Sequence, residues 1–537
     1  MKKQLLWIAM GAICPFQLFA GGIVTNSNQS ASYVRMLARD ASITLDAVYY
    51  NPAGITQLED GFHFSLNNQS IFQRKTIENK FPLLRESKYV GDVAAPFYPD
   101  VYAVYKTGKL AIGFGFQPNA GGGSAQYQTG LPSFEIPISV IPASLTANGI
   151  PTNIYSADIN FDGSSVFWGT QVNASYAFTD MISLSGGLRV IFAKNTYNGY
   201  IKNIMINPNQ PAFGTAYNGS NLVSATTFFS DAAKTLNAWS AGASSFSTGL
   251  TPIVAGGKGT VLVSDGTTAG LTAEQVGQIQ GLLQAAGQNP VGMNIQTAQA
   301  ILTAAAPTFK ANADKMSANS GGTTDKEVDA EQTGTGYTPF FGADVKVNDK
   351  LNIGIKYEFR TKLSLKNNTT IDGTGMFKDG DKVRSDIPAI LSVGLDYKLF
   401  PQLKFSTGVH YYFDKDAVIE SAPGVKKTIE GNLYEIAMGM EYDITEKVLI
   451  SAGYLYNKTG VGQGYQTDLT HSLTSNTVGF GGGFKVNEKM MLNLGVLYTM
   501  YTSDTKGIDY KKYGIESATE TYNRTNLVFS IGVDYHL

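Results

Sequence analysis

The chain has 537 residues, of which 58 are Gly, 29 are Tyr and 29 are Phe, and only 16% are charged. A formal net charge of −2 gives no indication of a nucleic-acid partner, and after residue 20 no run of about 18 apolar residues predicts a transmembrane helix. Abundant aromatic residues and glycine are typical of a chain built from many strands and turns.

Residues 1–20 are predicted to form a secretory signal peptide. They combine a basic start at Lys2-Lys3, a short apolar core at 5–13 and a cleavage site at 18–20, and the core is too short to span a bilayer. Cys14 is the only cysteine, and its neighbours do not fit a lipidation site. The mature chain is therefore expected to be exported and to contain no disulfide.

Residues 21–60 show no strand pattern and include one candidate helix around Ala31–Ala38. Near their end, Asp46 is followed by the turn sequence Asn51-Pro52-Ala53-Gly54, directly before the first alternating segment. Because proline fixes φ and lacks an N–H, this turn ends one element and redirects the chain into the next. On the residues alone, an ordinary turn with no further role remains an alternative.

From residue 61 onward, apolar residues repeatedly alternate with small or polar ones. In the last segment, residues 525–537, every second side chain is apolar, which indicates a strand whose two faces meet different solvents. Fourteen such segments are predicted, at 61–76, 95–106, 109–127, 163–178, 181–200, 336–347, 351–367, 386–399, 402–414, 431–443, 447–458, 474–486, 489–502 and 523–537.

The connections between these segments are asymmetric. Short turns alternate with long loops, so all the long loops fall on one side. An even number of long strands with this asymmetry predicts an all-β fold, a closed antiparallel transmembrane β-barrel of 14 strands in the outer membrane, because a sheet in hydrocarbon must pair every backbone group. A secreted β-sandwich is disfavoured, since its strands are shorter and its loops lack the asymmetry.

The third strand carries a sequence that disfavours regular pairing. After a regular start, residues 118–123 read Pro-Asn-Ala-Gly-Gly-Gly, and proline cannot donate to the ladder while glycines permit bends. The segment begins about eight residues after the preceding turn, well inside the wall. We interpret it as an inward kink that leaves a gap, rather than as the extracellular end of the strand, formed by Pro118, Asn119, Ala120, Gly121, Gly122 and Gly123.

Residues 203–332 interrupt the barrel after its fifth strand and are predicted to be a partly helical extracellular insertion. Thr272 opens a capping-box sequence, after which Leu283 lies on an apolar helical face. A second face includes Leu302 and is expected to end at Pro307. These faces either pack on each other or form an apolar landing surface for a ligand.

Candidate ligand contacts follow from strand parity. Parity points seven charged side chains into the lumen, where ion pairing is the ordinary role: Arg189, Lys356, Glu358, Arg360, Lys404, His410 and Glu435. For a ligand with a carboxylate, the candidates are Arg189, Lys356 and Arg360, since arginine can grip a carboxylate with two hydrogen bonds. The apolar candidates are Leu283, Leu302 and Phe134, the last in an apolar loop at 131–144 that we interpret as a wall of an access groove.

No catalytic or metal-binding pattern is found. The four histidines have no metal-ligand spacing, and no nucleophile motif or phosphate loop stands in the required context. The chain is therefore predicted not to be an enzyme and to need no cofactor or metal.

Residues 38–56, ARDASITLDAVYYNPAGIT, resemble the N-terminal signature of the FadL/TodX family of outer-membrane transport proteins. Asn51-Pro52-Ala53 match the family's Asn-Pro-Ala, and Asp46-Ala47 match the pair before it. The resemblance implies that residues 21–60 fold inside the barrel as a hatch and that residues 61–537 form its wall. It also implies that ligand leaves sideways through the kinked third strand.

The resulting prediction is passive, ligand-triggered transport of a hydrophobic small molecule, such as a long-chain fatty acid or an aromatic hydrocarbon, into outer-membrane lipid. Nothing in the sequence requires more than a monomer. The alternatives are a general porin, which permeability to small sugars would favour, and a surface-binding or adhesin barrel, which loss of cell binding on deleting residues 203–332 would favour.

Overall fold

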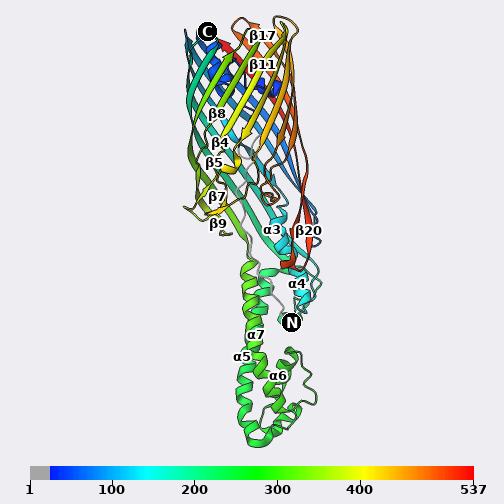
Figure 1. Ribbon diagram of the computed structural model, residues 1–537. Coiled ribbons are helices and arrows are strands. Elements are labelled where there is room, and N and C mark those ends of the chain that lie inside the picture. The colour runs from blue at the N-terminus through cyan, green and yellow to red at the C-terminus, as the bar shows by residue number, and fades with distance from the viewer. Residues whose placement is uncertain (1–24) are drawn as a thin grey trace. The chain divides into compact units, whose positions relative to one another are not determined.

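The computed structural model describes residues 25–537 (Figure 1). The predicted signal peptide lies outside the described residues. Among the described helices, none is both long enough and apolar enough to cross a membrane. The chain divides into two compact units, a β-barrel unit and a largely helical unit inserted into its sequence.

The barrel unit is an antiparallel sheet that closes on itself. Its first strand, β1 (Gly61–Asn79), pairs with β2 (Lys88–Thr107) along one edge and with the last strand, β20 (Ser517–His536), along the other. This closure removes the free sheet edges that a membrane-spanning sheet cannot have. The other long strands are β3 (Leu110–Tyr127), β4 (Tyr155–Ala177), β5 (Ile182–Ile206), β7 (Lys326–Lys346), β12 (Leu403–Tyr412), β15 (Tyr434–Asp443), β16 (Val448–Lys458) and β17 (Ser475–Asn487).

Three further crossings of the wall are each built from two consecutive strands. They are β8 (Leu351–Glu358) with β9 (Ser364–Asp372), β10 (Lys382–Arg384) with β11 (Ile390–Phe400), and β18 (Met490–Tyr501) with β19 (Asp504–Asp509). The wall thus has fourteen crossings, which confirms the predicted strand number. The short strands β6 (Val223–Ser224), β13 (Glu420–Ala422) and β14 (Val425–Lys426) add no crossing.

Every predicted strand overlaps an observed one, but several extend further than predicted. The strands β2, β7 and β20 begin earlier, at the end of the barrel that carries the long connections, here called the loop side. In β7 the added residues 326–335 read KEVDAEQTGT, in which Val328 and Ala330 are buried but the outward positions are the acidic Glu327, Asp329 and Glu331. The outward apolar residues that predict a strand in lipid are therefore missing from this strand end.

The outward face of the wall is apolar over a continuous band. On β1, Phe62, Phe64 and Leu66 have exposed fractions of 51%, 44% and 61%, as expected of side chains that meet lipid. The band ends toward the loop side at Arg74, which pairs with Asp92 across 2.7 Å, both side chains being exposed. This ion pair therefore marks the loop-side limit of the apolar band on β1.

The helical unit contains three main helices, α5 (Ala225–Ile253), α6 (Ala273–Ala285) and α7 (Ile295–Gly322), with short turns η2 (Pro211–Phe213), η3 (Val254–Lys258) and η4 (Val263–Ala269). The predicted capping box is present, since Thr272 and Gln275 each accept a backbone hydrogen bond from the other. Leu283 and Leu302 are fully buried in the core of this unit. In this structure the two leucines hold the helices together, as in the predicted arrangement in which the apolar faces pack on each other.

The prediction that the helix ends at Pro307 is wrong. Helix α7 continues through Pro307 to Gly322. Proline removes one backbone hydrogen bond from a helix, but α7 packs along α5, where the Trp239 and Phe309 rings lie 5.6 Å apart and the Ser240 hydroxyl donates to the Ala306 carbonyl at 2.8 Å. This tertiary packing outweighs the local penalty.

The apolar segment 131–144 forms two short helices rather than a loop, α3 (Pro132–Ser139) and α4 (Ile141–Ala147). Phe134 is 7% exposed, and its ring centre lies 5.4 Å from that of Phe161 on β4. In this structure Phe134 therefore packs against the wall, and its predicted part in an access groove stays a prediction.

Candidate functional site

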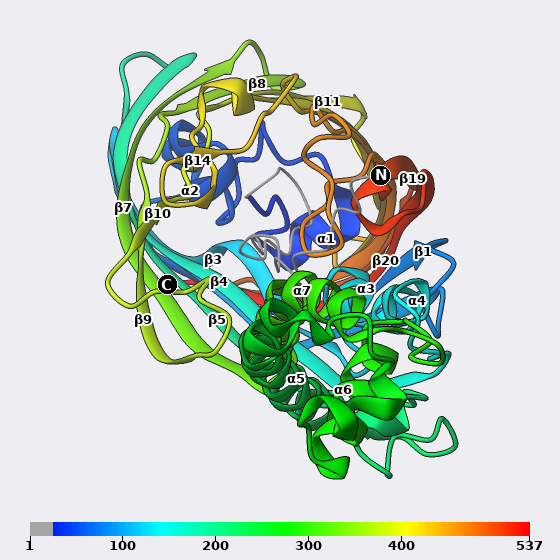
Figure 2. The same cartoon turned by 90° about the horizontal axis from the view of Figure 1, so that it is seen from below.

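The N-terminal segment 25–60, here called the plug, lies inside the barrel (Figure 2). It contains α1 (Ala31–Met36), which overlaps the predicted helix, α2 (Ala47–Tyr50), and the 3-10 helix η1 (Pro52–Gln57). Nearly all residues from 25 to 56 are buried. The segment that lacked a strand pattern thus forms much of the barrel interior.

Asp46 organises the plug internally. Its carboxylate pairs with both Nε and a terminal nitrogen of Arg39, at 2.9 and 2.8 Å. It also accepts hydrogen bonds from the hydroxyls of Ser30, Ser42 and Thr44 at 2.9, 2.7 and 2.9 Å. A buried carboxylate with this many donors is fully compensated, so Asp46 fixes the fold of the plug.

Asn51 ties the plug to the wall. Its side-chain amide donates to the Ser42 carbonyl within the plug at 3.1 Å and to Asp344 Oδ1 on β7 at 2.6 Å. Gln57 donates to the other oxygen of Asp344, also at 2.6 Å. The turn therefore anchors the end of the plug where the chain enters the wall.

The rest of the turn leaves no room for larger side chains. Pro52 starts η1 and its carbonyl accepts a hydrogen bond from Ser175 on β4 at 2.6 Å, and Ala53 is fully buried. A Cβ atom on Gly54 would lie 2.5 Å from the Ser42 carbonyl and from the Asn51 amide nitrogen. Glycine at this position is what allows Asn51 to reach both of its partners.

A belt of glycines lines the wall where the plug touches it. An added Cβ would lie 3.1 Å or less from a plug atom at each of these positions: Gly342, Gly354, Gly394, Gly408, Gly439, Gly453, Gly479, Gly481, Gly495 and Gly532. Several are direct cross-strand partners, such as Gly394 with Gly408 and Gly439 with Gly453. The backbone of the plug therefore packs directly on the backbone of the wall, a close fit that dispersion forces favour.

Two of the predicted carboxylate-binding residues already share a carboxylate of the wall. Arg189 and Lys356 both pair with Glu358, at 2.5 and 2.6 Å, with all three side chains buried. The two cations also lie over the ring of Tyr49 in the plug, at 4.8 and 4.4 Å from its centre. Lys356 further donates to the Tyr49 carbonyl at 2.7 Å. These contacts connect the plug to the wall, and any role in ligand binding stays a prediction.

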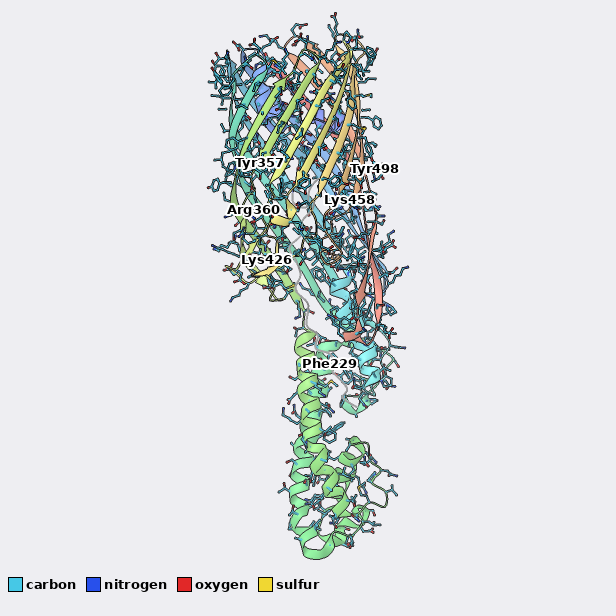
Figure 3. The ribbon with its side chains drawn as sticks, viewed as in Figure 1. Phe229, Tyr357, Arg360, Lys426, Lys458 and Tyr498 are labelled. Atoms are coloured by element: carbon cyan, nitrogen blue, oxygen red, sulfur yellow. The ribbon has the colours of Figure 1, made fainter. Side chains whose placement is uncertain are left out.

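Arg360 lies elsewhere, between β8 and β9 at the loop side (Figure 3). Its guanidinium is about one third exposed and lies 3.9 Å from the buried Asp386 carboxylate. It also donates to the Asp416 carbonyl. The structure therefore does not bring Arg360 together with Arg189 and Lys356 as one group.

Two further ionic contacts hold the plug in place. His410 on β12 hydrogen-bonds Asp40 of the plug at 2.6 Å through Nε2 and Glu435 of the wall at 2.8 Å through Nδ1. Arg35 of the plug pairs with Glu441 on β15. Parity placed His410 and Glu435 in the lumen, but it could not show that they meet a plug residue.

The pairing of β3 with β2 is interrupted at the predicted kink. Residues 101–107 of β2 pair with residues 110–116 of β3, and Asp92 and Val93 of β2 pair with Gln126 and Ala125 of β3. The residues between these two paired regions form no β2–β3 pairs. Residues 117–121 are all buried, which breaks the in–out alternation. Pairing of β3 with β4 continues past two register shifts, at Pro118/Ala120 and Gly121/Gly123. The wall thus has an inward-turned stretch without β2–β3 ladder bonds.

The plug supplies hydrogen bonds to this interrupted stretch. The Asn26 backbone N–H donates to the Asn119 carbonyl at 2.9 Å, and its side chain donates to the Gly121 carbonyl at 2.5 Å. Gln29 donates to the Pro118 carbonyl at 3.1 Å. The Pro118 carbonyl also accepts a hydrogen bond from the Tyr98 hydroxyl of β2 at 2.7 Å. The plug therefore supplies donors to buried carbonyls that have no backbone partner on β2.

The strands remain in contact across the interruption. A Cβ atom on Gly123 would lie 3.2 Å from the Cβ of Ala95 on β2. On the outer wall an open groove includes Val93, Ala94, Ser124 and Gln126 in its lining. The interruption is therefore closed in this structure, with a groove beside it.

These features define the protein class, an outer-membrane β-barrel of fourteen crossings with a plug bound inside. Residues 290–536 match the family described as outer membrane protein transport protein (OMPP1/FadL/TodX). This match covers a little under half of the chain and confirms the resemblance predicted from residues 38–56. A comparison with curated protein sequences gives no match.

The fold is similar to that of solved structures. A FadL homologue of Pseudomonas aeruginosa is 12% identical with a TM-score of 0.55, over 97% of this chain and 99% of that one. The toluene transporters TodX of Pseudomonas putida and TbuX of Ralstonia pickettii are each 13% identical, with TM-scores of 0.48 and 0.47. Both matches cover 92% of this chain, and 95% and 94% of the respective transporters.

Proposed function

We propose that the protein carries hydrophobic molecules, either long-chain fatty acids or aromatic hydrocarbons, passively from outside the cell into the outer membrane, acting as a single chain. Ligand is captured on the loop side, the plug rearranges, and the ligand leaves sideways through the interrupted stretch of β3. The observation that carries this proposal is the set of plug hydrogen bonds to the Pro118, Asn119 and Gly121 carbonyls.

Those bonds couple the plug to the wall. A shift of Asn26 and Gln29 would remove the plug donors from the Asn119 and Gly121 carbonyls, and each buried carbonyl left without a donor costs about 1–3 kcal/mol. The Pro118 carbonyl would keep only the Tyr98 hydroxyl at 2.7 Å. The wall would then relax by moving its weakest part, the stretch without β2–β3 ladder bonds. Ligand that binds better when the plug has shifted therefore raises the population of the open wall.

A sideways exit suits an apolar cargo. The plug region is rich in buried polar groups, including Asp46, Asn51 and Gln29, and transferring apolar surface past such groups and water is unfavourable. Lipid lies directly outside the apolar band of the wall. A path from the lumen through the wall into lipid therefore avoids the polar base of the barrel.

A reversible disulfide across the interruption tests this route. Ala95→Cys with Gly123→Cys places two thiols on Cβ positions 3.2 Å apart, a few tenths of an ångström below ordinary disulfide spacing. In cells lacking their own transporter, we expect uptake of a labelled long-chain fatty acid to be lost when the bond forms and restored by reductant. The reduced double variant is the matched control for any strain at Gly123.

Replacing residues 118–123 with a regular alternating strand should block uptake in the same way. Uptake that persists with the disulfide formed would rule out lateral release. Absence of fatty-acid and aromatic-hydrocarbon uptake in the wild-type protein, despite correct insertion, would contradict the proposed cargo, and permeability to small sugars would then support a porin.

A further inference from the structure

Two cationic side chains face each other inside the barrel near the loop side. Lys75 on β1 and Arg524 on β20 are direct cross-strand partners, and both side chains point into the lumen and are buried, at 1% and 4% exposure. Like charges directly opposite each other in a sheet are destabilising. This pair adjoins Arg74, so it lies at the loop-side limit of the apolar band, toward the outside of the cell.

Aromatic rings and one histidine lie beside Arg524. The Arg524 guanidinium lies 5.2 Å from the centre of the Tyr501 ring and donates to the His471 carbonyl at 3.1 Å. The His471 ring stacks on Tyr522 at 5.1 Å. Burial, with the charges of Arg524 and Lys75, holds the pKa of His471 well below its ordinary value. The site is thus a buried positive centre with aromatic walls.

Lys75 differs from the other buried cations of the barrel. Arg35, Arg39, Arg189 and Lys356 each pair with a carboxylate, whereas Lys75 has no hydrogen bond or ion pair with any residue that the structure describes. Residues 1–24 cannot supply the missing charge, because their sequence contains no Asp or Glu.

Two buried carboxylates on the loop side, Glu520 and Asp468, have hydrogen-bond partners of their own. Glu520 accepts hydrogen bonds from Tyr522 and from Asn79. Asp468 accepts from the backbone N–H of Ser133 at 2.8 Å. A buried ammonium without a partner is unfavourable, and an anion from solution would compensate it.

We propose that Lys75 and Arg524, bordered by His471, form a binding site for the anionic head group of an amphipathic ligand, a carboxylate or a phosphate. The inference rests on the proposed function, since the ligand must reach the lumen. Tyr501 also borders a narrow internal gap, together with apolar Leu455, Leu497 and Val528 and the plug residues Ser27, Asn28 and Tyr33. This gap is too small for an alkyl chain, so a head group at Lys75 would place its chain against the plug only when the plug has shifted, as the proposed function requires.

The test compares ligands that differ only in the head group. Binding of laurate, dodecyl phosphate and the neutral dodecanol is measured by calorimetry on the purified full chain in a non-ionic detergent. We expect both anions to bind at least about tenfold more tightly than dodecanol, because charge-assisted hydrogen bonds add to the shared apolar contribution. The tighter of the two anions identifies the head-group class.

Lys75→Met, Arg524→Gln and their combination should each remove that preference and leave dodecanol binding unchanged. Lys194→Met, on an exposed lysine of the wall, is the matched control. The unfolding temperature gives a second readout, since laurate should raise it in the wild type and in the control but not in the double variant.

Equal affinity for laurate and dodecanol, or a preference that survives the double substitution, would overturn the inference while leaving hydrophobic transport intact. Displacement of laurate by millimolar inorganic phosphate alone would also overturn it, since the site would then hold a free anion. Failure of laurate, dodecanol and toluene alike to bind or to be taken up would instead contradict the proposed function.

Discussion

Replacing Glu358 with glutamine is expected to destabilise the plugged barrel by about 3–5 kcal/mol, the usual cost of removing one partner from a buried ion pair. Glu358 is the carboxylate that Arg189 and Lys356 share, and all three side chains are buried. Its loss leaves two positive charges without a counter-ion beside Tyr49 of the plug. The measurement is heat modifiability. Samples of the purified barrel are heated to a series of temperatures and run on a denaturing gel, and the temperature at which the band of the folded barrel disappears is recorded.

The control for this variant is Glu488→Gln. Glu488 also pairs with a lysine, Lys485 at 2.7 Å, but in a turn where its side chain is 88% exposed. An exposed pair contributes at most about 1 kcal/mol, so this variant should unfold near the wild-type temperature. Adding Lys356→Met to Glu358→Gln should recover part of the loss, because one of the two unpaired charges is removed. Equal unfolding temperatures for Glu358→Gln and Glu488→Gln would contradict the stabilising role of Glu358 as the shared counter-ion of Arg189 and Lys356.

The strands could be predicted because their signal lies within each segment. In β20, for example, every second residue between 527 and 537 is apolar, and that pattern alone tells which face meets lipid. The plug has no such pattern. Its interior is built from polar residues such as Asp46 and Asn51, whose composition resembles that of a surface loop, so its place inside the barrel was implied only by the resemblance to a family.

The site was harder to predict because it depends on register between strands. Parity correctly pointed Arg189 and Lys356 inward, but it did not show that Glu358 lies between them. Lys75 and Arg524 could not be predicted as a pair for the same reason, since only the closure of β1 on β20 brings the two ends of the chain together. Helix α7 shows a different limit, because packing on α5 overrode the local effect of Pro307.

The glycine belt was also not predicted. Within a single strand each of these glycines is simply one of the small residues that alternate with apolar ones. Their alignment becomes visible only when neighbouring strands are paired, as for Gly394 and Gly408. The belt also gives the strongest prediction about the plug. Several of these glycines lie against main-chain atoms of the plug, which cannot move away as a flexible side chain can.

Gly394→Val is expected to displace the plug and open the barrel to ions. A Cβ atom on Gly394 would lie 2.5 Å from the Asp40 Cβ and 2.7 Å from the Ala41 backbone nitrogen. Overpacking of this kind costs about 1–3 kcal/mol, which favours the displaced plug over the bound plug by about 5- to 150-fold. Moving Asp40 also breaks its hydrogen bond to His410. The measurement is single-molecule conductance in planar lipid bilayers.

Gly507→Val is the matched control, since the same substitution on β19 meets no atom within 4 Å. Both variants add the same side chain to a wall strand, so any general effect of valine on barrel assembly should be shared. A correctly folded Gly394→Val barrel with the conductance of the control would mean that the plug tolerates the added side chain. Steric contact with the wall would then not be enough to displace the plug, and ligand binding deeper in the lumen would be the next cause to test.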